Sequence, residues 1–70
     1  MPTAQEWLSD YADKLGVPMP SAEEIDAILA LAGVAAHASE RIAAPVACWM
    51  AAGSDVSLAD ARRLADELAG

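Results

Sequence analysis

Apolar residues near the start of the chain recur at intervals of three and four, which is the spacing of one face of a helix. They are Ala4, Trp7, Leu8, Tyr11, Ala12 and Leu15. Thr3 and Glu6 stand three residues apart at the start of this pattern, in the form of a capping box. Gly16 and two nearby prolines follow it and favour a stop. The pattern therefore predicts a helix that begins after Thr3 and ends at Leu15.

A second capping box, Ser21 with Glu24, predicts the start of the next helix. This helix is apolar most of the way round, so we expect it to be the central and most buried element. Its main apolar stripe is Ile25, Ile28, Leu29, Ala32, Ala35 and Ala36. We expect it to run to about Glu40 or Arg41. Gly33 lies in its middle, where it costs up to about 1 kcal/mol against Ala, and we interpret it as a place where another helix crosses closely.

Two shorter helices complete the chain. Pro45 is well suited to the first turn of a helix, so a short third helix is predicted from Pro45 to about Ala52. Ser57 is the expected cap of a fourth helix. The inner stripe of that helix is Leu58, Ala61, Leu64, Ala65 and Leu68, and its expected ion pairs are Arg62 with Asp66 and Arg63 with Glu67. The predicted fold is all-α, a compact bundle of four helices with the third one short, forming a single domain over residues 1–70.

Composition and charge limit the classes of function. The chain has 70 residues, of which 56% are hydrophobic but only 4% aromatic, so its core is small and association with another chain is expected to complete its burial. Its formal net charge of −7 argues against binding to nucleic acid. No uncharged run is longer than Ala27 to Ser39, which is shorter than the ~20 residues of a membrane span. The N-terminus has no signal-peptide pattern and the single Cys forms no internal disulfide, so a cytoplasmic protein is expected, without nucleic acid or membrane as a partner.

The region from His37 to Ala47 is the first candidate site. On a continuous helix, His37 and Arg41 would project from the same face, just before a helix start that has no side-chain cap. Free N–H groups at a helix start attract anions. We therefore predict an anion pocket formed by His37, Arg41 and the N–H groups of Val46 and Ala47, for a phosphate or a partner's carboxylate. The commoner alternative is that both basic residues only complement the negative end of their helix.

Cys48, Trp49 and Met50 are the second set of candidates. Cys48 could act as a nucleophile with His37 as its base, but a Cys between apolar residues is more often part of the core. One His and one Cys do not supply the three or four ligands of a usual metal site, so neither a metal nor a cofactor is expected. Trp49 and Met50 are either core residues or, if they are exposed, a partner surface.

Several segments together resemble a known family. They are Trp7-Leu8, residues 28–32, residues 34–45 and Ala51-Ala52-Gly53. They resemble a small actinobacterial domain of unknown function that occurs alone or attached to molybdenum cofactor guanylyltransferases. The family is often labelled a molybdopterin-guanine dinucleotide biosynthesis protein. The specific part is His37, Arg41 and the Ala-Ala-Pro that follows. This chain departs from the family pattern at Ile42, where a Pro is expected, and at Ala47 and Cys48, where hydroxyl residues are expected.

The resemblance implies a role beside the enzyme that joins a guanine nucleotide to molybdopterin. The chain itself has no Gly-rich phosphate loop and no metal-binding carboxylate pair. The leading hypothesis is a non-enzymatic accessory module that binds a protein partner in the molybdenum cofactor pathway. Two alternatives remain open. One is a small-ligand binder that holds a phosphate-bearing pterin or nucleotide at the His37 and Arg41 corner, and the other is self-association as a structural homo-oligomer.

Overall fold

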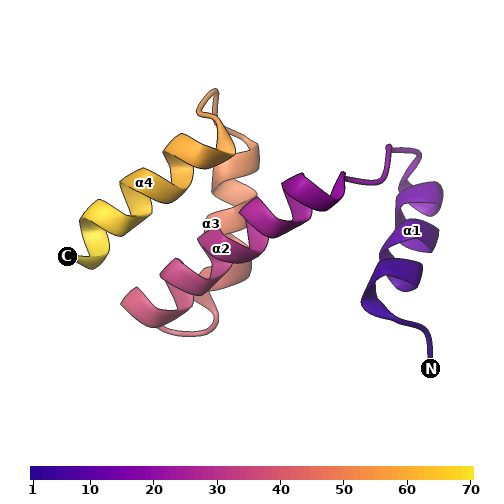
Figure 1. The fold of residues 1–70 in the computed structure, drawn as a ribbon, viewed down its shortest axis with the longest axis horizontal. Helices are drawn as coiled ribbons and strands as arrows, with labels where there is room; N and C mark the ends of the chain where they lie inside the picture. Colours follow the sequence, from indigo (N-terminus) through magenta and orange to yellow (C-terminus); the bar gives the residue numbers. More distant parts are fainter.

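The computed structural model describes all 70 residues and contains four helices. They are α1 (Ala4–Leu15), α2 (Ala22–Ala38), α3 (Ala43–Ala52) and α4 (Leu58–Ala69), as Figure 1 shows. The all-α fold with a short third helix is confirmed. Even α2, the longest helix, is not long and apolar enough to cross a membrane.

The predicted helix starts are formed by the expected side chains. In α1, the Thr3 hydroxyl accepts the N–H of Glu6 at 3.1 Å, and the Glu6 carboxylate accepts the N–H of Thr3 at 3.0 Å. Ser21 and Glu24 form the same capping box at the start of α2, with distances of 3.1 and 2.9 Å. Gly16 ends α1 with a φ of 74°, a conformation that residues with a Cβ rarely adopt. These boundaries agree with the sequence because local hydrogen bonds determine them.

The Glu6 carboxylate gives a pH prediction. The pKa of the Glu6 carboxyl group is lowered from its usual value, first of all because the carboxylate accepts the N–H of Thr3. A hydrogen bond with the Thr3 side chain lowers it further. A lowered pKa stabilises the folded first turn at pH values above the ordinary Glu pKa, and this stabilisation is lost as the pH falls through the lowered value. We expect NMR titration of Glu6 to show this lower pKa in the folded chain and a return to the ordinary value in urea. Equal values in the two states would contradict the capping box in solution.

The connection between α2 and α3 differs from the prediction. α2 ends at Ala38 instead of Glu40 or Arg41, and α3 begins at Ala43 instead of Pro45. The reason is a turn in which the N–H of Ala43 donates to the Glu40 carbonyl at 2.9 Å and the N–H of Ala44 donates to the Arg41 carbonyl at 3.2 Å. Pro45 is therefore the third residue of α3. It fits there because the first N–H groups of a helix have no partner within the helix.

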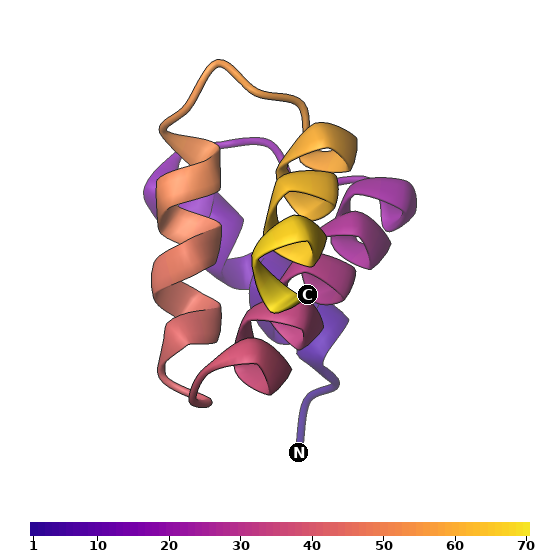
Figure 2. The ribbon, with the colours of Figure 1, turned by 90° about the vertical axis from the view of Figure 1, so that its left-hand side faces the viewer.

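Helix α2 is the centre of the packed part of the molecule. It packs against both α3 and α4, which have only limited contact with each other. In Figure 2, α4 lies in front, between α3 and α2. Leu31 of α2 is the least exposed residue of the chain, at 3%. The prediction that α2 is the central helix is confirmed.

On α4, the predicted ion pairs Arg62–Asp66 and Arg63–Glu67 are present at 3.7 and 2.8 Å, and all four side chains are exposed.

Gly33 does not mark a close helix crossing, so that interpretation was wrong. A Cβ placed on Gly33 would meet no heavy atom within 4 Å, and the residue has a negative φ. Replacing Gly33 with Ala therefore removes backbone freedom from the unfolded chain without a steric cost. We expect Gly33→Ala to raise the free energy of unfolding by about 0.5–1 kcal/mol, measured by urea denaturation. A lower unfolding midpoint would show that the Gly33 face of α2 is covered in solution.

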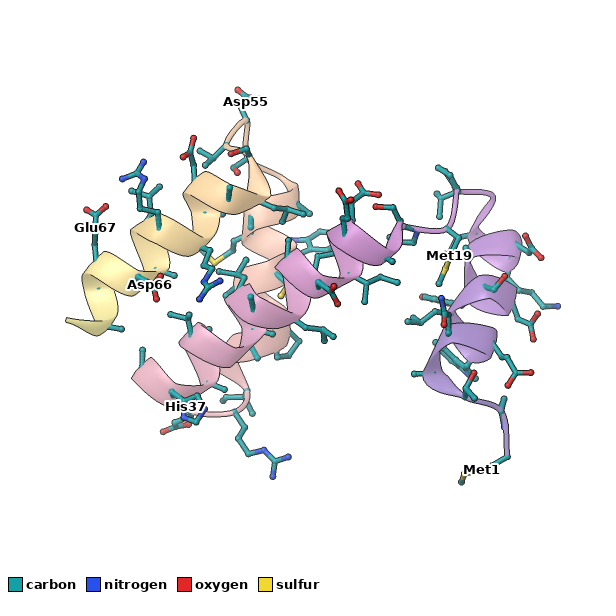
Figure 3. All side chains as sticks on the ribbon, in the orientation of Figure 1. Met1, Met19, His37, Asp55, Asp66 and Glu67 are labelled. Carbon is teal, nitrogen blue, oxygen red and sulfur yellow. The ribbon has the colours of Figure 1, made fainter.

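Helix α1 stands apart from the other three helices. None of its Cα atoms lies within 8 Å of a Cα in another helix, and Figure 1 shows it at one end of the molecule. The radius of gyration is 12.9 Å, compared with about 11 Å for a compact chain of this length. Met19, in the connection, lies on the side of α1 that faces α2 (Figure 3). The large side chains of α1 consequently gain little burial from the rest of the chain.

Candidate functional site

Helix α3 has no charged residue and no polar side chain other than a thiol. Five of its six small side chains are half-buried, on the side that packs against the other helices. They are Ala43, Ala44, Ala47, Cys48 and Ala51. Small residues let helices approach closely, but they leave the larger side chains of α3 on the opposite face. A helix that is apolar all round normally has neighbours all round. Here α3 has neighbours on one side only.

The outward side of α3 carries a continuous apolar surface, which we call the α3 stripe. It consists of Ile42, at the helix cap, with Val46, Trp49 and Met50, spaced as i, i+4, i+7 and i+8. The exposed fractions of these four side chains range from 56% to 80%, and Trp49 is the most exposed. Surface apolar residues scattered singly need no explanation, whereas a group of them on one helix face is a feature that interaction sites often have. Of the two interpretations given for Trp49 and Met50, a place in the core is therefore wrong, because both side chains are exposed.

The stripe lies in the uncharged part of the chain. Residues 27–54 contain one acid, Glu40, and one base, Arg41, so their formal net charge is zero. The charge of −7 is carried by residues 1–26 and 55–70. An apolar surface with few charges nearby has little desolvation cost when it is covered.

A groove continues the apolar surface from α3 to α4. It has a volume of about 310 Å³ and runs from Met50 to Leu64 and Leu68 of α4, past Val56 in the loop between the helices. Nine of its ten lining residues are hydrophobic. Met50 belongs to both features, so the stripe and this α3–α4 groove form one surface. Large side chains of a partner could be accommodated there.

The residues of the predicted anion pocket are arranged differently from the prediction, which placed His37 and Arg41 on one helix face. His37 lies in the last turn of α2 (Figure 3), whereas Arg41 lies beyond the end of that helix, so the two are not on one continuous helix. Both are exposed and neither forms an ion pair or a side-chain hydrogen bond. α3 does begin without a side-chain cap. Its first two N–H groups, however, donate to the carbonyls of Glu40 and Arg41, and Pro45 has no N–H. The exposed Val46 and half-buried Ala47 follow in the same turn.

Cys48 lies between α3 and α2. Its Sγ is 3.8 Å from the carbonyl oxygen of Ile28, to which it donates a weak hydrogen bond, and the residue is half-buried. This position agrees with a packing role for the thiol. No group of three or more His, Cys, Asp or Glu side chains is placed to hold a metal ion.

Sequence reasoning missed two parts of the surface, Ile42 and the α3–α4 groove. The spacing of Ile42 to Val46 is a helical i, i+4 step and could have extended the stripe, but the predicted start of α3 at Pro45 excluded Ile42. The groove had no local signal, because it depends on how α4 crosses α3.

Comparison with known families places the whole chain in one of them. Residues 1–70 match a family described as a domain of unknown function (DUF6457). No curated protein and no solved structure matches the chain. The chain therefore belongs to the DUF6457 family.

Proposed function

We propose that this chain is a non-enzymatic accessory module that binds a protein partner in the molybdenum cofactor pathway, and that the α3 stripe is the surface it uses. The observation that carries the binding role is the exposure of Ile42, Val46, Trp49 and Met50 on one face of a helix without charge. Tryptophan and methionine are enriched in protein interfaces, and charged residues are depleted from their centres. The choice of pathway rests on the sequence resemblance described above.

The chemistry of the stripe defines the kind of partner surface. Side chains at i, i+4, i+7 and i+8 are the anchors of a helix that lies in an apolar groove. The partner is therefore expected to offer an uncharged hydrophobic groove wide enough for Trp49. Four side chains are far fewer than the roughly 20–30 residues that each partner contributes to a standard stable interface, so a transient complex is expected. This agrees with a module that acts beside an enzyme.

The direct test is a binding measurement with the enzyme that the resemblance names. The chain is titrated by calorimetry into a purified molybdenum cofactor guanylyltransferase from the same genome. We expect saturable binding of one chain per enzyme subunit in the micromolar range, with a negative heat-capacity change, because apolar surface is buried. An absence of binding at about 100 µM, a concentration that detects even weak complexes, would overturn the assignment to this pathway.

The alternative function, binding of a phosphate-bearing pterin or nucleotide by His37 and Arg41, is favoured by one observation. Arg41 has no ionic partner, whereas both arginines of α4 do. Against it, His37 and Arg41 do not lie on one continuous helix, as the predicted pocket required. Titration with inorganic phosphate and guanine nucleotides, followed by amide NMR, distinguishes the two functions. A saturable shift at residues 43–47 that is lost in Arg41→Ala would favour the ligand site over the protein-binding module.

A further inference from the structure

The faces of α1 and α2 that look toward each other are mostly apolar and uncovered. On α1 four large apolar side chains are exposed by 39% to 56%, namely Trp7, Leu8, Tyr11 and Leu15, and Leu8 is the one that lies toward α2. On α2, Ile25 is half-buried and Leu29 is exposed. A groove of about 480 Å³ separates the two helices, and Leu8, Ile25 and Leu29 are among its lining residues. The chain thus has an exposed apolar surface on each of two helices that do not touch.

The connection between these helices explains why they stay apart. Residues 17–21 have no regular structure, and two of them, Pro18 and Pro20, have a fixed φ. Each residue before a proline is also restricted to extended conformations. Residues 17–20, when extended, place the end of α1 about 12 Å from the start of α2, at roughly 3.1 Å per residue. This distance is larger than the separation of about 8–10 Å between the axes of packed helices. The stiff connection therefore holds α1 away from its own α2.

The exposed area shows how much surface remains to be covered. The chain exposes 5583 Å², whereas a compact monomer of 7.2 kDa exposes about 4,100 Å². The excess of about 1,500 Å² is nearly twice the ~800 Å² that each partner contributes to a standard interface. Reciprocal exchange of one helix covers two patches on each chain, the donated helix and the face that receives its counterpart. The excess area fits that arrangement.

We propose that two copies of this chain form a dimer by exchanging α1, so that α1 of each copy packs on the uncovered face of α2 in the other. The arrangement has two-fold symmetry, and each copy makes the same contact twice. Trp7, Tyr11 and the leucines of α1 become buried against Ile25 and Leu29 of the second copy. The α3 stripe takes no part in this contact, so the dimer can form with or without the proposed partner of α3.

Crosslinking between differently labelled chains tests the exchange. Cys48 is first replaced by Ala in every chain, and Leu8→Cys is placed in one chain and Leu29→Cys in a second chain that carries a tag. Treatment of the mixture with a short bismaleimide is expected to give the crosslinked heterodimer. The control mixture pairs Leu8→Cys with Leu68→Cys, which lies on α4 and is 91% exposed. Equal yields in the two mixtures would overturn the proposal.

Sedimentation equilibrium and a hinge variant complete the test. The unmodified chain is expected to have twice the mass of 7.2 kDa at about 100 µM. In Pro18→Gly/Pro20→Gly a flexible connection gives the chain's own α1 an effective concentration of about 1 mM. Packing of α1 on α2 of the same chain then outcompetes the exchange. We expect the dimer dissociation constant to rise about tenfold or more, with unchanged helix content by circular dichroism. A monomeric unmodified chain, or a dimer that the hinge variant leaves equally tight, would overturn the exchange.

Discussion

Replacing Leu31 with Ala is expected to lower the free energy of unfolding by about 2–5 kcal/mol. Leu31 is the least exposed side chain of the molecule, and it lines both the space between α2 and α3 and the α3–α4 groove. Five of the residues that line these spaces with it are alanines, which are too short to fill the space that a lost isobutyl group leaves. The cavity therefore remains, and its cost adds to the lost burial of the side chain.

The loss expected for Leu31→Ala is a large fraction of the total stability, because the chain is small. At roughly 0.05–0.15 kcal/mol per residue, a chain of this length has a total stability on the order of 4–10 kcal/mol. Urea denaturation followed by circular dichroism, at several protein concentrations, measures the change. Leu68→Ala is the matched control, because Leu68 is a leucine on the surface of α4, and it should change the stability by less than about 0.5 kcal/mol. Equal unfolding midpoints for the two variants would mean that Leu31 is not at the centre of the packing.

Replacing Trp49 with Ala is expected to weaken binding of the proposed partner by about 30-fold or more, the effect of losing an interface hot spot of about 2 kcal/mol. The indole is 80% exposed and contributes little to the packing of α3 on α2. The stability of the chain alone should therefore change by less than about 0.5 kcal/mol. Calorimetric titration and urea denaturation of the same variant separate the two effects.

Trp7 supplies a matched control for Trp49. It is the other tryptophan of the chain, is half-exposed, and stacks near Tyr11 on α1 with ring centroids 5.1 Å apart. Trp7→Ala should leave partner binding unchanged but weaken the α1-exchanged dimer, and Trp49→Ala should do the reverse. If the two substitutions weakened partner binding equally, the α3 stripe would not be the specific surface. The pair of variants also shows which of the two proposals fails, should one of them fail.

The features that sequence reasoning predicted correctly are local ones. The capping boxes of Thr3 and Ser21, the left-handed Gly16 and the ion pairs of α4 all join residues within four positions of each other. Such contacts depend on the helix geometry alone. The end of α2 was predicted two or three residues too late, because nothing in the pattern distinguishes a continuing helix from the turn that Glu40 and Arg41 form.

The candidate site could be predicted only in part, for a physical reason. α3 is apolar on every side, so the periodicity of its sequence does not indicate which side faces inward. Only its packing on α2 and α4 decides that Cys48 is half-buried while Trp49 and Met50 are exposed. The separation of α1 from the other helices could not be predicted either, because the apolar stripe of α1 has the spacing of an ordinary packed helix. Gly33 was misinterpreted because the sequence around a helical glycine does not indicate whether another helix lies close to it.

Trp49 fluorescence is the most direct test that the α3 stripe is a protein-binding surface. With Trp7 replaced by Phe, Trp49 is the only tryptophan, and its emission reports on its own environment. Our account predicts the emission of a water-exposed indole in the free chain and a saturable shift to shorter wavelength when the guanylyltransferase is added. Emission that stays unchanged while calorimetry shows that the complex is saturated would contradict it.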